Sequence, residues 1–333
     1  MKLRPLGRTG LMVSEIGLGT IAFGGTCDEK TSFALLDLAR DSGINWIDTA
    51  DVYPSPGPQG CQGGTEEIIG HWLKSGAKRS EIMIASKAGK AILPGFKQRG
   101  LSKKHLIAAC EASLKRLMTD YLDLYFLHTP DTETPLEETL RTLDDLVGQG
   151  KVRHIGVSNF SASRLNEGLR VSNDMNLTRF SCVQSRYNLF YRDLERDLLP
   201  LCQRERLGVT VYNPLAAGLL SGKYRFEDAR SGARFGNSQG FYREAYWQKP
   251  VFEGIDALRS VFGPRQIPLV HVALAWLLRQ PDLSSIVLGA TSIHQLQESL
   301  EGRLLELSRD DIALCDSLAG KMPKQLKSRT TDR

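Results

Sequence analysis

The stretch Gly43-Ile-Asn-Trp-Ile-Asp-Thr-Ala-Asp-Val-Tyr53 decides how the rest of the chain is interpreted. It reads as a short apolar strand, Ile44 to Ile47, that runs directly into polar residues. Asp48 stands at the expected end of this strand, and Tyr53 follows in the next loop. A carboxylate in this position must be paired or solvated. The pattern is therefore as compatible with a functional site as with a capping Asp and an exposed Tyr.

On both sides of this stretch, apolar strands alternate with amphipathic helices. Strands are expected over 16–20, 44–47, 82–87, 121–128, 152–158, 180–184, 209–212 and 284–289. Helices are expected over 28–41, 65–74, 193–206, 270–278, 293–300 and 310–318, and further helices begin at Ser102, Thr134 and Ser161. The residues between 213 and 269 read as a long irregular stretch.

The strands are apolar along nearly their whole length, which indicates burial on both faces and hence a parallel sheet. Eight such units predict an α/β fold of the (β/α)8 or TIM-barrel type, in one domain over 1–333. An N-terminal β-hairpin over about 1–16 and extra C-terminal helices are expected around it, and the tail from about 321 to 333 is expected to be mobile. A doubly wound open sheet is the alternative.

One motif in the first strand argues for a different fold. Gly17-x-Gly19-x-x-Ala22 matches the dinucleotide fingerprint of the Rossmann fold. That fingerprint requires a helix that opens inside the motif, but Phe23-Gly24-Gly25-Thr26 interrupts it, and helical periodicity starts only near residue 28. We therefore do not assign a Rossmann fold.

Composition excludes several classes of protein. The 333 residues carry a net charge of only +5, which does not favour a nucleic-acid partner. No apolar run approaches the ~18 residues of a membrane span, and the N-terminus lacks the apolar core of a signal peptide. The 6 cysteines are scattered and form no C-x-x-C pair, which favours reduced thiols in a cytoplasm.

Polar residues follow the strands, at the face of a barrel where chemistry is built. They are Thr20, Asp48, Lys87, His128, Ser158, Asn159, Gln184, Tyr212, Gly289 and Thr291. Asp48 and Lys87 come from adjacent strands and are placed to pair, and an ammonium near Tyr53 favours its phenolate and improves it as a proton donor. His128 is placed to hydrogen-bond a substrate oxygen or to share the proton.

This set of residues suits proton transfer to a carbonyl oxygen while a second component delivers hydride to carbon. A protein side chain cannot deliver hydride, so a cofactor is implied. No thiol or serine nucleophile has a base at a comparable position. No H-x-H motif follows the first strand and no carboxylate cluster is present, so we expect no metal site.

At this point the sequence resembles the aldo-keto reductase superfamily, from about Leu6 to Leu318. The resemblance rests on 43–53, on Tyr121-Leu-Asp-Leu-Tyr-Phe-Leu-His128, and on Gly150-Lys-Val-Arg-His-Ile-Gly-Val-Ser-Asn159. It extends through Val211-Tyr-Asn-Pro-Leu-Ala-Ala-Gly-Leu-Leu-Ser-Gly-Lys-Tyr224 and Leu288-Gly-Ala-Thr291. The sequence is similar above all to bacterial aldo-keto reductases and to the branch that includes channel β-subunits.

The resemblance implies a catalytic tetrad of Asp48, Tyr53, Lys87 and His128. Tyr53 is then the general acid, Lys87 and Asp48 tune it, and His128 orients the carbonyl of an aldehyde or ketone that is reduced to an alcohol, in a reversible reaction. Tyr53, His128 and Phe23 are expected to contact this small-molecule substrate.

The resemblance also implies NADPH as the cofactor, with NADH as an alternative. Ser158, Asn159 and Gln184 match the positions that hold the nicotinamide carboxamide, and Tyr212 matches the aromatic residue that stacks on the ring. The cofactor residues implied elsewhere are Gly19, Thr20, Asp48, Asn213, Pro214, Leu215, Ala216, Gly218, Ser221, Lys223, Arg234, Gly289, Thr291, Gln295, Glu298 and Ser299.

Two departures from the family pattern affect these expectations. The basic residue that meets the 2′-phosphate of NADP is absent around 289–295, so Lys223 and Arg234 are the candidates to supply that charge. A long Pro/Gly segment over 54–64 replaces a compact turn after Tyr53, and it is placed to line the substrate pocket or only its rim. The resemblance also leaves open a regulatory or assembly subunit with little turnover, the role of the channel β-subunits.

Overall fold

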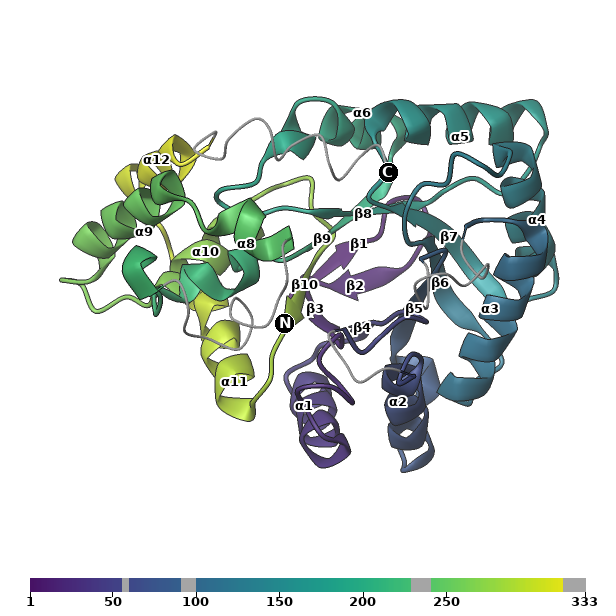
Figure 1. Ribbon diagram of the computed structural model, residues 1–333, viewed down its shortest axis with the longest axis horizontal. Coiled ribbons are helices and arrows are strands. Elements are labelled where there is room, and N and C mark those ends of the chain that lie inside the picture. Colours follow the sequence, from purple (N-terminus) through teal and green to yellow (C-terminus); the bar gives the residue numbers. More distant parts are fainter. Residues whose placement is uncertain (56–59, 91–99, 229–240, 320–333) are drawn as a thin grey trace.

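The computed structural model describes residues 1–55, 60–90, 100–228 and 241–319. Its centre is a closed barrel with the strand order β10-β3-β4-β5-β6-β7-β8-β9, in which every neighbouring pair is parallel. Helices surround the barrel (Figure 1). The predicted (β/α)8 barrel is confirmed, and the doubly wound open sheet is excluded by the closure between β10 and β3.

The barrel strands are short and separated by helices, as the alternation in the sequence predicted. They are β3 (Ile16–Gly19), β4 (Trp46–Asp48), β5 (Met83–Ala88), β6 (Leu122–Leu127), β7 (Val152–Ser158), β8 (Cys182–Arg186), β9 (Gly208–Tyr212) and β10 (Ser285–Gly289). The main helices are α1 (Glu29–Asp41), α2 (Gly64–Lys74), α3 (Lys103–Leu117), α4 (Leu136–Gly148), α5 (Ala162–Asp174), α6 (Leu198–Glu205), α8 (Phe241–Tyr246), α9 (Lys249–Phe262), α10 (Leu269–Leu278), α11 (Ile293–Glu301) and α12 (Arg309–Ser317). Short 3-10 turns are η1 (Arg79–Glu81), η2 (Asp193–Glu195), η3 (Ala216–Ser221), η4 (Phe226–Asp228) and η5 (Gly302–Leu304).

The inside of the barrel has an apolar layer below a polar one. Side chains on a strand alternate between its two faces, so residues two apart point the same way. On four strands, a residue of the apolar layer is followed two positions later by a polar residue nearer the carboxyl end. The pairs are Trp46 and Asp48, Ala85 and Lys87, Phe126 and His128, and Cys182 and Gln184. The strand register therefore brings these four polar groups to one level.

The N-terminal hairpin closes the opposite end of the barrel. Strands β1 (Leu3–Pro5) and β2 (Met12–Ser14) pair antiparallel and lie across the middle of the ring of helices (Figure 1). Leu6 and Val13 of the hairpin region pack with the apolar layer of the barrel. Apolar side chains therefore fill this end of the barrel, and the polar layer lies toward the carboxyl ends of the strands.

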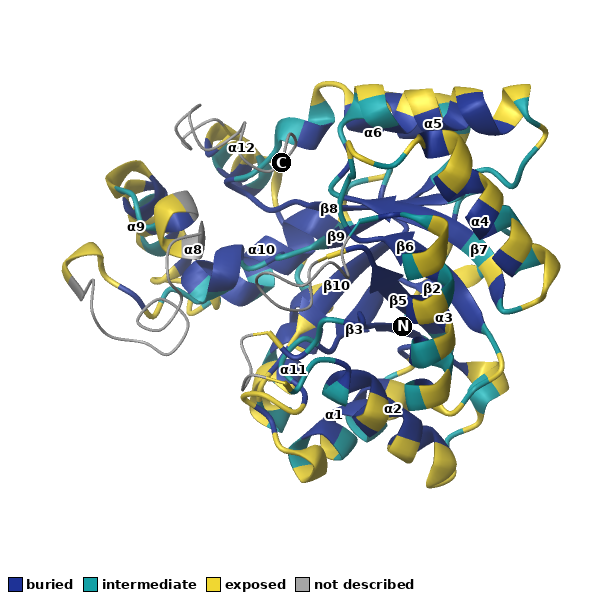
Figure 2. Ribbon diagram, turned by 45° about the vertical axis from the view of Figure 1, so that its right-hand side comes forward, coloured by how far each residue is buried: buried dark blue, intermediate teal, exposed yellow. Residues whose placement is uncertain are grey.

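The apolar composition of α10 is explained by its burial. This helix is apolar on all sides, which is typical of a helix that is covered all round. It packs against α9, α11, η3 and η5, and it is buried along almost its whole length (Figure 2).

Several predicted elements need correction. The strand predicted over 180–184 is β8, Cys182–Arg186, because Ser181 still lies in the connection that bonds to Ile155. The helix predicted over 193–206 is divided into η2 and α6. The stretch 213–269 is not irregular throughout, since it contains the 14-residue helix α9. Val251, Ile255, Leu258 and Phe262 recur there at helical spacing, so the signal was present.

Local capping follows the sequence at most of the predicted helix starts. The side chain of Ser161 accepts a hydrogen bond from the Arg164 amide at the start of α5, and Asp28 does the same for Thr31 at the start of α1. Ser102 occupies the corresponding position of α3, but its side chain makes no capping bond. The dinucleotide fingerprint at Gly17 is followed by turns, and the next helix begins at Glu29, which rules out a Rossmann unit.

Two predicted segments lie wholly or partly outside the described residues. The tail expected over 321–333 is not described, and of the Pro/Gly segment 54–64 only 54–55 and 60–64 are described. Within the described ranges, none of the helices is both long enough and apolar enough to cross a membrane.

Candidate active site

The centre of the polar layer is an ion pair between two neighbouring strands. Lys87 on β5 donates from Nζ to Asp48 Oδ2 on β4 at 2.6 Å and to the backbone oxygen of Thr49 at 2.8 Å. Both side chains are almost completely buried. Burial lowers the pKa of the Lys87 ammonium, and the attraction of the Asp48 carboxylate opposes this decrease. The predicted pairing of Asp48 with Lys87 is thus present in the structure.

Tyr53 lies beside this ion pair, in the loop after β4. The Lys87 ammonium is 5.2 Å from the centre of the Tyr53 ring, and the ring stands edge-to-face with His128 at a centroid distance of 5.9 Å. The backbone oxygen of Tyr53 accepts a hydrogen bond from Gly63 N at 2.9 Å. The end of the Pro/Gly segment therefore returns to Tyr53 and holds its backbone in place.

His128 follows β6 and is nearly fully buried. Burial lowers its pKa well below the ordinary value, and the ammonium groups of Lys90 and Lys87 lower it further. Its Nδ1 atom is buried and has no hydrogen-bond partner in the described structure. The imidazole is therefore neutral at physiological pH, so it offers one N–H donor to a ligand oxygen but no extra proton.

Gln184 of the polar layer and the nearby side chains of Asn159 and Tyr212 extend this hydrogen-bond network. Gln184 donates from Nε2 to Asp48 Oδ1 at 2.7 Å, so both carboxylate oxygens of Asp48 are bound. Asn159 donates from Nδ2 to the backbone oxygen of His128 at 3.0 Å and to Ser158 Oγ at 3.1 Å. Tyr212 in turn donates its hydroxyl to Asn159 Oδ1 at 2.7 Å.

This arrangement fits a carboxamide ligand such as that of nicotinamide. A carboxamide offers one acceptor oxygen and an NH2 donor. The Ser158 hydroxyl accepts from Asn159 and keeps its own hydrogen to donate, while Gln184 uses its NH2 on Asp48 and keeps its oxygen to accept. The protein's own hydrogen bonds thus hold both a hydrogen-bond donor and an acceptor in position for a carboxamide.

The segment after β9 forms a turn of unusual backbone conformation. Asn213, Ala216 and Ala217 have φ values of 61°, 49° and 59°, and Gly218 follows at 97°. Left-handed backbone is unfavourable for residues with a Cβ atom and is found where the surrounding structure enforces it, often at ligand sites. The Asn213 side chain accepts a hydrogen bond from Ala217 N at 2.6 Å, which holds the turn. The predicted residues Pro214, Leu215 and Ser221 belong to the same segment.

The residues predicted for the far end of the cofactor lie around α11. The backbone N–H and hydroxyl of Thr291 both donate to Gln295 Oε1, at 3.0 and 2.9 Å. Gly289 and Gln295 are exposed, whereas Ser299 is buried. Glu298 accepts a bond from His271 through its backbone oxygen, at 2.8 Å. Lys223 is exposed, and Arg234 lies outside the described residues.

Three residues predicted to contact cofactor or substrate lie at the end of β3 or in the loop that follows it. Thr20 donates from Oγ1 to the backbone oxygen of Asp48 at 2.8 Å, and Gly19 ends β3 beside it. Phe23, predicted to contact substrate, is fully buried among core residues. Its contact with substrate stays a prediction.

Comparison with known proteins agrees with this geometry. The family model described as "Aldo/keto reductase family" matches residues 15–319. The chain is 36% identical over 340 residues to "Protein tas" from Escherichia coli (strain K12), with 94% of this chain and 96% of the relative covered. It is 33% identical over 309 residues to "Probable voltage-gated potassium channel subunit beta" from Oryza sativa subsp. japonica, with 90% of each chain covered. A protein of the same description from Arabidopsis thaliana is 33% identical over 306 residues.

The chain belongs to the aldo/keto reductase family. This confirms the predicted resemblance, including its similarity to bacterial members and to the channel β-subunit branch. Family membership supports an oxidoreductase that uses a nicotinamide cofactor.

This aldo/keto reductase has a buried acidic group behind the tetrad that was not predicted from the sequence. Asp51 is buried although it lies in the quoted stretch, three residues after Asp48. Glu66, on α2, is also fully buried and is paired with Arg116 from α3 at 2.6 Å. The signal for it in the sequence was the second carboxylate of the stretch 43–53.

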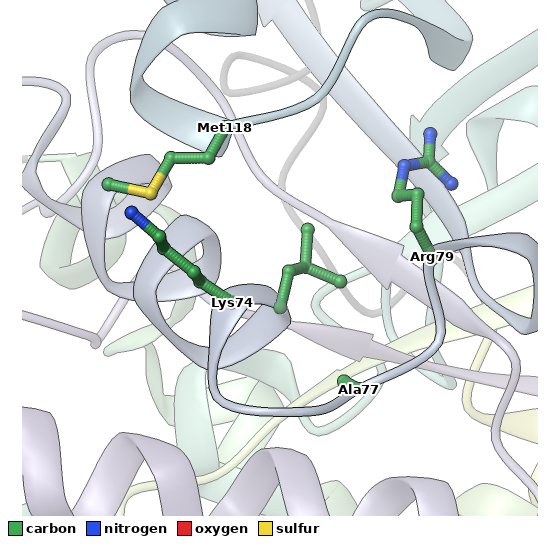
Figure 3. Close-up of a pocket in the computed structure, with 5 residues that line it drawn as sticks. Lys74, Ala77, Arg79 and Met118 are labelled. Carbon is green, nitrogen blue, oxygen red and sulfur yellow. The ribbon is translucent and has the colours of Figure 1, made fainter.

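A surface groove elsewhere on this aldo/keto reductase is unrelated to the tetrad. It has a volume of about 290 Å³ and is lined by Leu73, Lys74, Ala77, Arg79 and Met118 (Figure 3). Arg79 precedes β5 and Met118 precedes β6, so the groove lies at the amino ends of the strands, opposite the polar layer. Across the described ranges, His, Cys, Asp and Glu side chains nowhere gather in a group of three or more that suits a metal ion.

Proposed function

We propose that this protein is an NADPH-dependent reductase of aldehydes or ketones, reversible as an alcohol dehydrogenase. Tyr53 donates the proton to the carbonyl oxygen, Lys87 and Asp48 tune its acidity, and His128 positions the oxygen through its N–H group. When bound, the cofactor supplies the hydride that no side chain can provide.

The observation that carries this proposal is the buried Lys87–Asp48 pair with Tyr53 and His128 at the open end of the barrel. Because burial and two ammonium groups lower the pKa of His128, the imidazole has no proton to give at neutral pH. Tyr53 is the remaining acid of the tetrad, and the positive charge of Lys87 stabilises the phenolate that it becomes. The proton donor and the oxygen-orienting donor are therefore two different residues.

The residues that would hold the cofactor fall into three groups. Ser158, Asn159 and Gln184 hold the carboxamide, and Tyr212 provides an aromatic face beside it. The left-handed turn at 213–218 would hold the phosphates through its backbone N–H groups, as successive N–H groups in such turns do. Thr291 and Gln295 would contact the adenosine end.

NADPH is proposed over NADH because the exposed Lys223 follows the left-handed turn at 213–218 and carries a positive charge that can bind the 2′-phosphate. The positions around 289–295 are Gly289, Thr291 and Gln295, none of which carries a positive charge. Recognition of the 2′-phosphate would thus rest on cations of the segment that begins at Lys223 and not on α11.

The decisive experiment is the substitution Tyr53→Phe. The loss of the phenolic proton should lower kcat/KM for aldehyde reduction by roughly 100-fold or more, the range expected for general acid catalysis. Cofactor affinity should change little, because the ring is retained and the carboxamide residues are intact. Aldehyde-dependent oxidation of NADPH and cofactor titration by fluorescence measure the two quantities.

Tyr121→Phe is a matched control for this experiment. Tyr121 lies at the amino end of β6, where its ring is stacked between Arg79 and Arg153 at 4.0 and 3.7 Å, so the same atom is removed far from the polar layer. It should leave turnover unchanged. Near wild-type reduction by the Tyr53→Phe protein would refute the role of Tyr53.

A second candidate is a cofactor-binding regulatory or assembly subunit with little turnover. It is favoured by the names of the plant relatives, which are described as channel subunits. In this case a panel of aldehydes should give negligible NADPH oxidation although the cofactor binds tightly. Turnover by the wild-type protein that Tyr53→Phe abolishes would exclude it.

A further inference from the structure

Asp51 is a buried carboxyl group in the loop that connects β4 to Tyr53. Its residue is only 2% exposed, and neither carboxyl oxygen has a hydrogen-bond partner in the described structure. Its backbone N–H donates to the backbone oxygen of Lys87 at 3.0 Å, which fixes the loop against β5. An ionised carboxylate in such a place is costly because burial removes its hydration without replacing it.

The cations near Asp51 are already paired with other carboxylates. On the helix side, Arg116 donates from Nε and Nη2 to Glu66 Oε2 at 2.8 and 2.6 Å, and Ser86 donates to Glu66 Oε1 at 2.5 Å. On the barrel side, Lys87 is bound to Asp48 at 2.6 Å.

The side-by-side packing of α2 and α3 fixes this arrangement (Figure 1). Gly63 permits it, since a Cβ atom there would come within 2.6 Å of the Arg116 side chain.

Two of the cations near Asp51 are therefore matched by other carboxylates. Lys87 and Arg116 carry two positive charges, and Asp48 and Glu66 carry two negative ones. Among the described residues, Lys90, which is exposed and adds a third positive charge, and the buried Tyr125 of β6 also interact with Asp51. Burial raises the pKa of Asp51 to about 8, and the Glu66 carboxylate adds to this increase against the opposing charges of Arg116 and Lys87.

We propose that Asp51 is a positioning residue for proton transfer: it stays an uncharged acid at neutral pH, so that the positive charge of Lys87 acts undiminished on Tyr53. This inference rests on the proposed role of Tyr53. When Asp51 ionises at alkaline pH, it adds a negative charge next to Lys87. That charge disfavours the Tyr53 phenolate, because like charges oppose ionisation.

The effect on Tyr53 has a definite sign. In the wild-type protein the phenol titrates against a negative charge that develops at Asp51 as the pH rises. In Asp51→Asn this position stays neutral at every pH. The titration midpoint of Tyr53 should therefore fall in the variant, by roughly half a pH unit or more for a charge in a site of low dielectric constant.

The experiment is a near-ultraviolet titration of tyrosine ionisation, which needs no turnover. The signal of Tyr53 is the difference between a protein and the same protein with Tyr53→Phe, measured once in the wild-type background and once in the Asp51→Asn background. Asp41→Asn, which neutralises an exposed Asp at the end of α1, controls for the change in net charge. A lower midpoint in Asp51→Asn alone supports the proposal, and an equal midpoint overturns it.

A second measurement uses only the wild-type protein, so it does not depend on whether a variant folds. In wild-type protein labelled with carbon-13 at Asp carboxyl groups, one resonance should titrate near pH 8, far above the ordinary range of Asp. If every Asp resonance titrates below about pH 6, Asp51 is ionised at neutral pH and the proposal fails. Both measurements stay readable if the protein does not reduce carbonyls, so a failure of the proposed function is distinguished from a failure of this inference.

Discussion

At the scale of single residues, the site depends on charges that are neutralised in pairs. Asp48 uses one oxygen for Lys87 and the other for Gln184, so its orientation is set by two strands at once. Such a buried pair adds little to stability compared with an apolar pair, but the loss of one partner leaves an uncompensated charge. Substitutions in this layer therefore affect folding as well as catalysis, and conservative variants are the informative ones.

The raised pKa of Asp51 also predicts how the stability of the protein depends on pH. An ordinary Asp titrates near 4, whereas burial raises the pKa of Asp51 to about 8 in the folded protein. Between these values the native state holds a proton that the unfolded chain has released, so the free energy of unfolding falls as pH rises, by up to about 1.4 kcal/mol per pH unit. Asp51→Asn removes this slope and should be more stable than wild type near pH 8.

Urea unfolding at several pH values between about 5 and 9 measures this difference. The free energies of unfolding of wild type and Asp51→Asn should be most similar at the lowest pH. The difference between them should stop growing above about pH 8. Parallel stability curves over the whole range would contradict the prediction. The comparison needs no cofactor and no substrate.

At the scale of elements, the contact between α2 and α3 supports the loop that carries Tyr53. Gly70 of α2 lies against the backbone of α3, and a Cβ atom there would come within 2.2 Å of the Arg116 backbone oxygen. The small residue lets the helices approach closely enough for Arg116 to reach Glu66. The packing of two outer helices is thus linked to the buried charges behind the tetrad.

Gly70→Ala should therefore destabilise the protein. The helices must separate to admit the methyl group, at a cost of about 1–3 kcal/mol for overpacking, in spite of the better helix propensity of Ala. Gly148→Ala is the matched control, because it also lies in a helix and has no atom within 4 Å of its added Cβ. Thermal unfolding should show a lower Tm for Gly70→Ala and an equal or higher Tm for Gly148→Ala. Equal Tm values for the two variants would show that the contact is loose.

At the scale of the whole molecule, the barrel brings together residues that are far apart in the sequence. Asp48 and Gln184 are hydrogen-bonded across 136 positions of the chain. The turn after β9 and the start of α11 lie after neighbouring strands, since β9 and β10 are adjacent in the barrel. A long ligand that spans the carboxamide residues, the turn and α11 therefore contacts both halves of the chain.

Cofactor binding should consequently stabilise the entire fold. At a concentration about 100 times Kd, a ligand that binds only the native state adds about 2.7 kcal/mol to the free energy of unfolding. We expect NADP⁺ to raise Tm more than NAD⁺ at equal concentration if, as proposed, Lys223 contributes to binding of the 2′-phosphate. Substitution Lys223→Gln should reduce the increase for NADP⁺ and leave that for NAD⁺ nearly unchanged. A larger increase with NAD⁺ would overturn the proposed preference.

The sequence alone was enough to predict the barrel and to place Asp48, Lys87 and His128 after its strands. Apolar strands that alternate with helices leave few architectures, and parallel strands place the residues after their carboxyl ends at one face. Asp48, Lys87 and His128 could therefore be predicted to meet, and the ion pair between the first two is observed. Helix α9 could also have been predicted, from the helical spacing of its apolar residues.

Tertiary structure alone decided the ionisation states and the burial of single groups. His128 is neutral and Asp51 is an acid with a raised pKa because the packing removes them from water, and no local pattern encodes that packing. For the same reason the sequence did not distinguish Asp48, which is paired on both oxygens, from Asp51, which is paired on neither. Which side chain has a partner depends on α2, α3 and β8, elements that only the folded chain brings to the loop after β4.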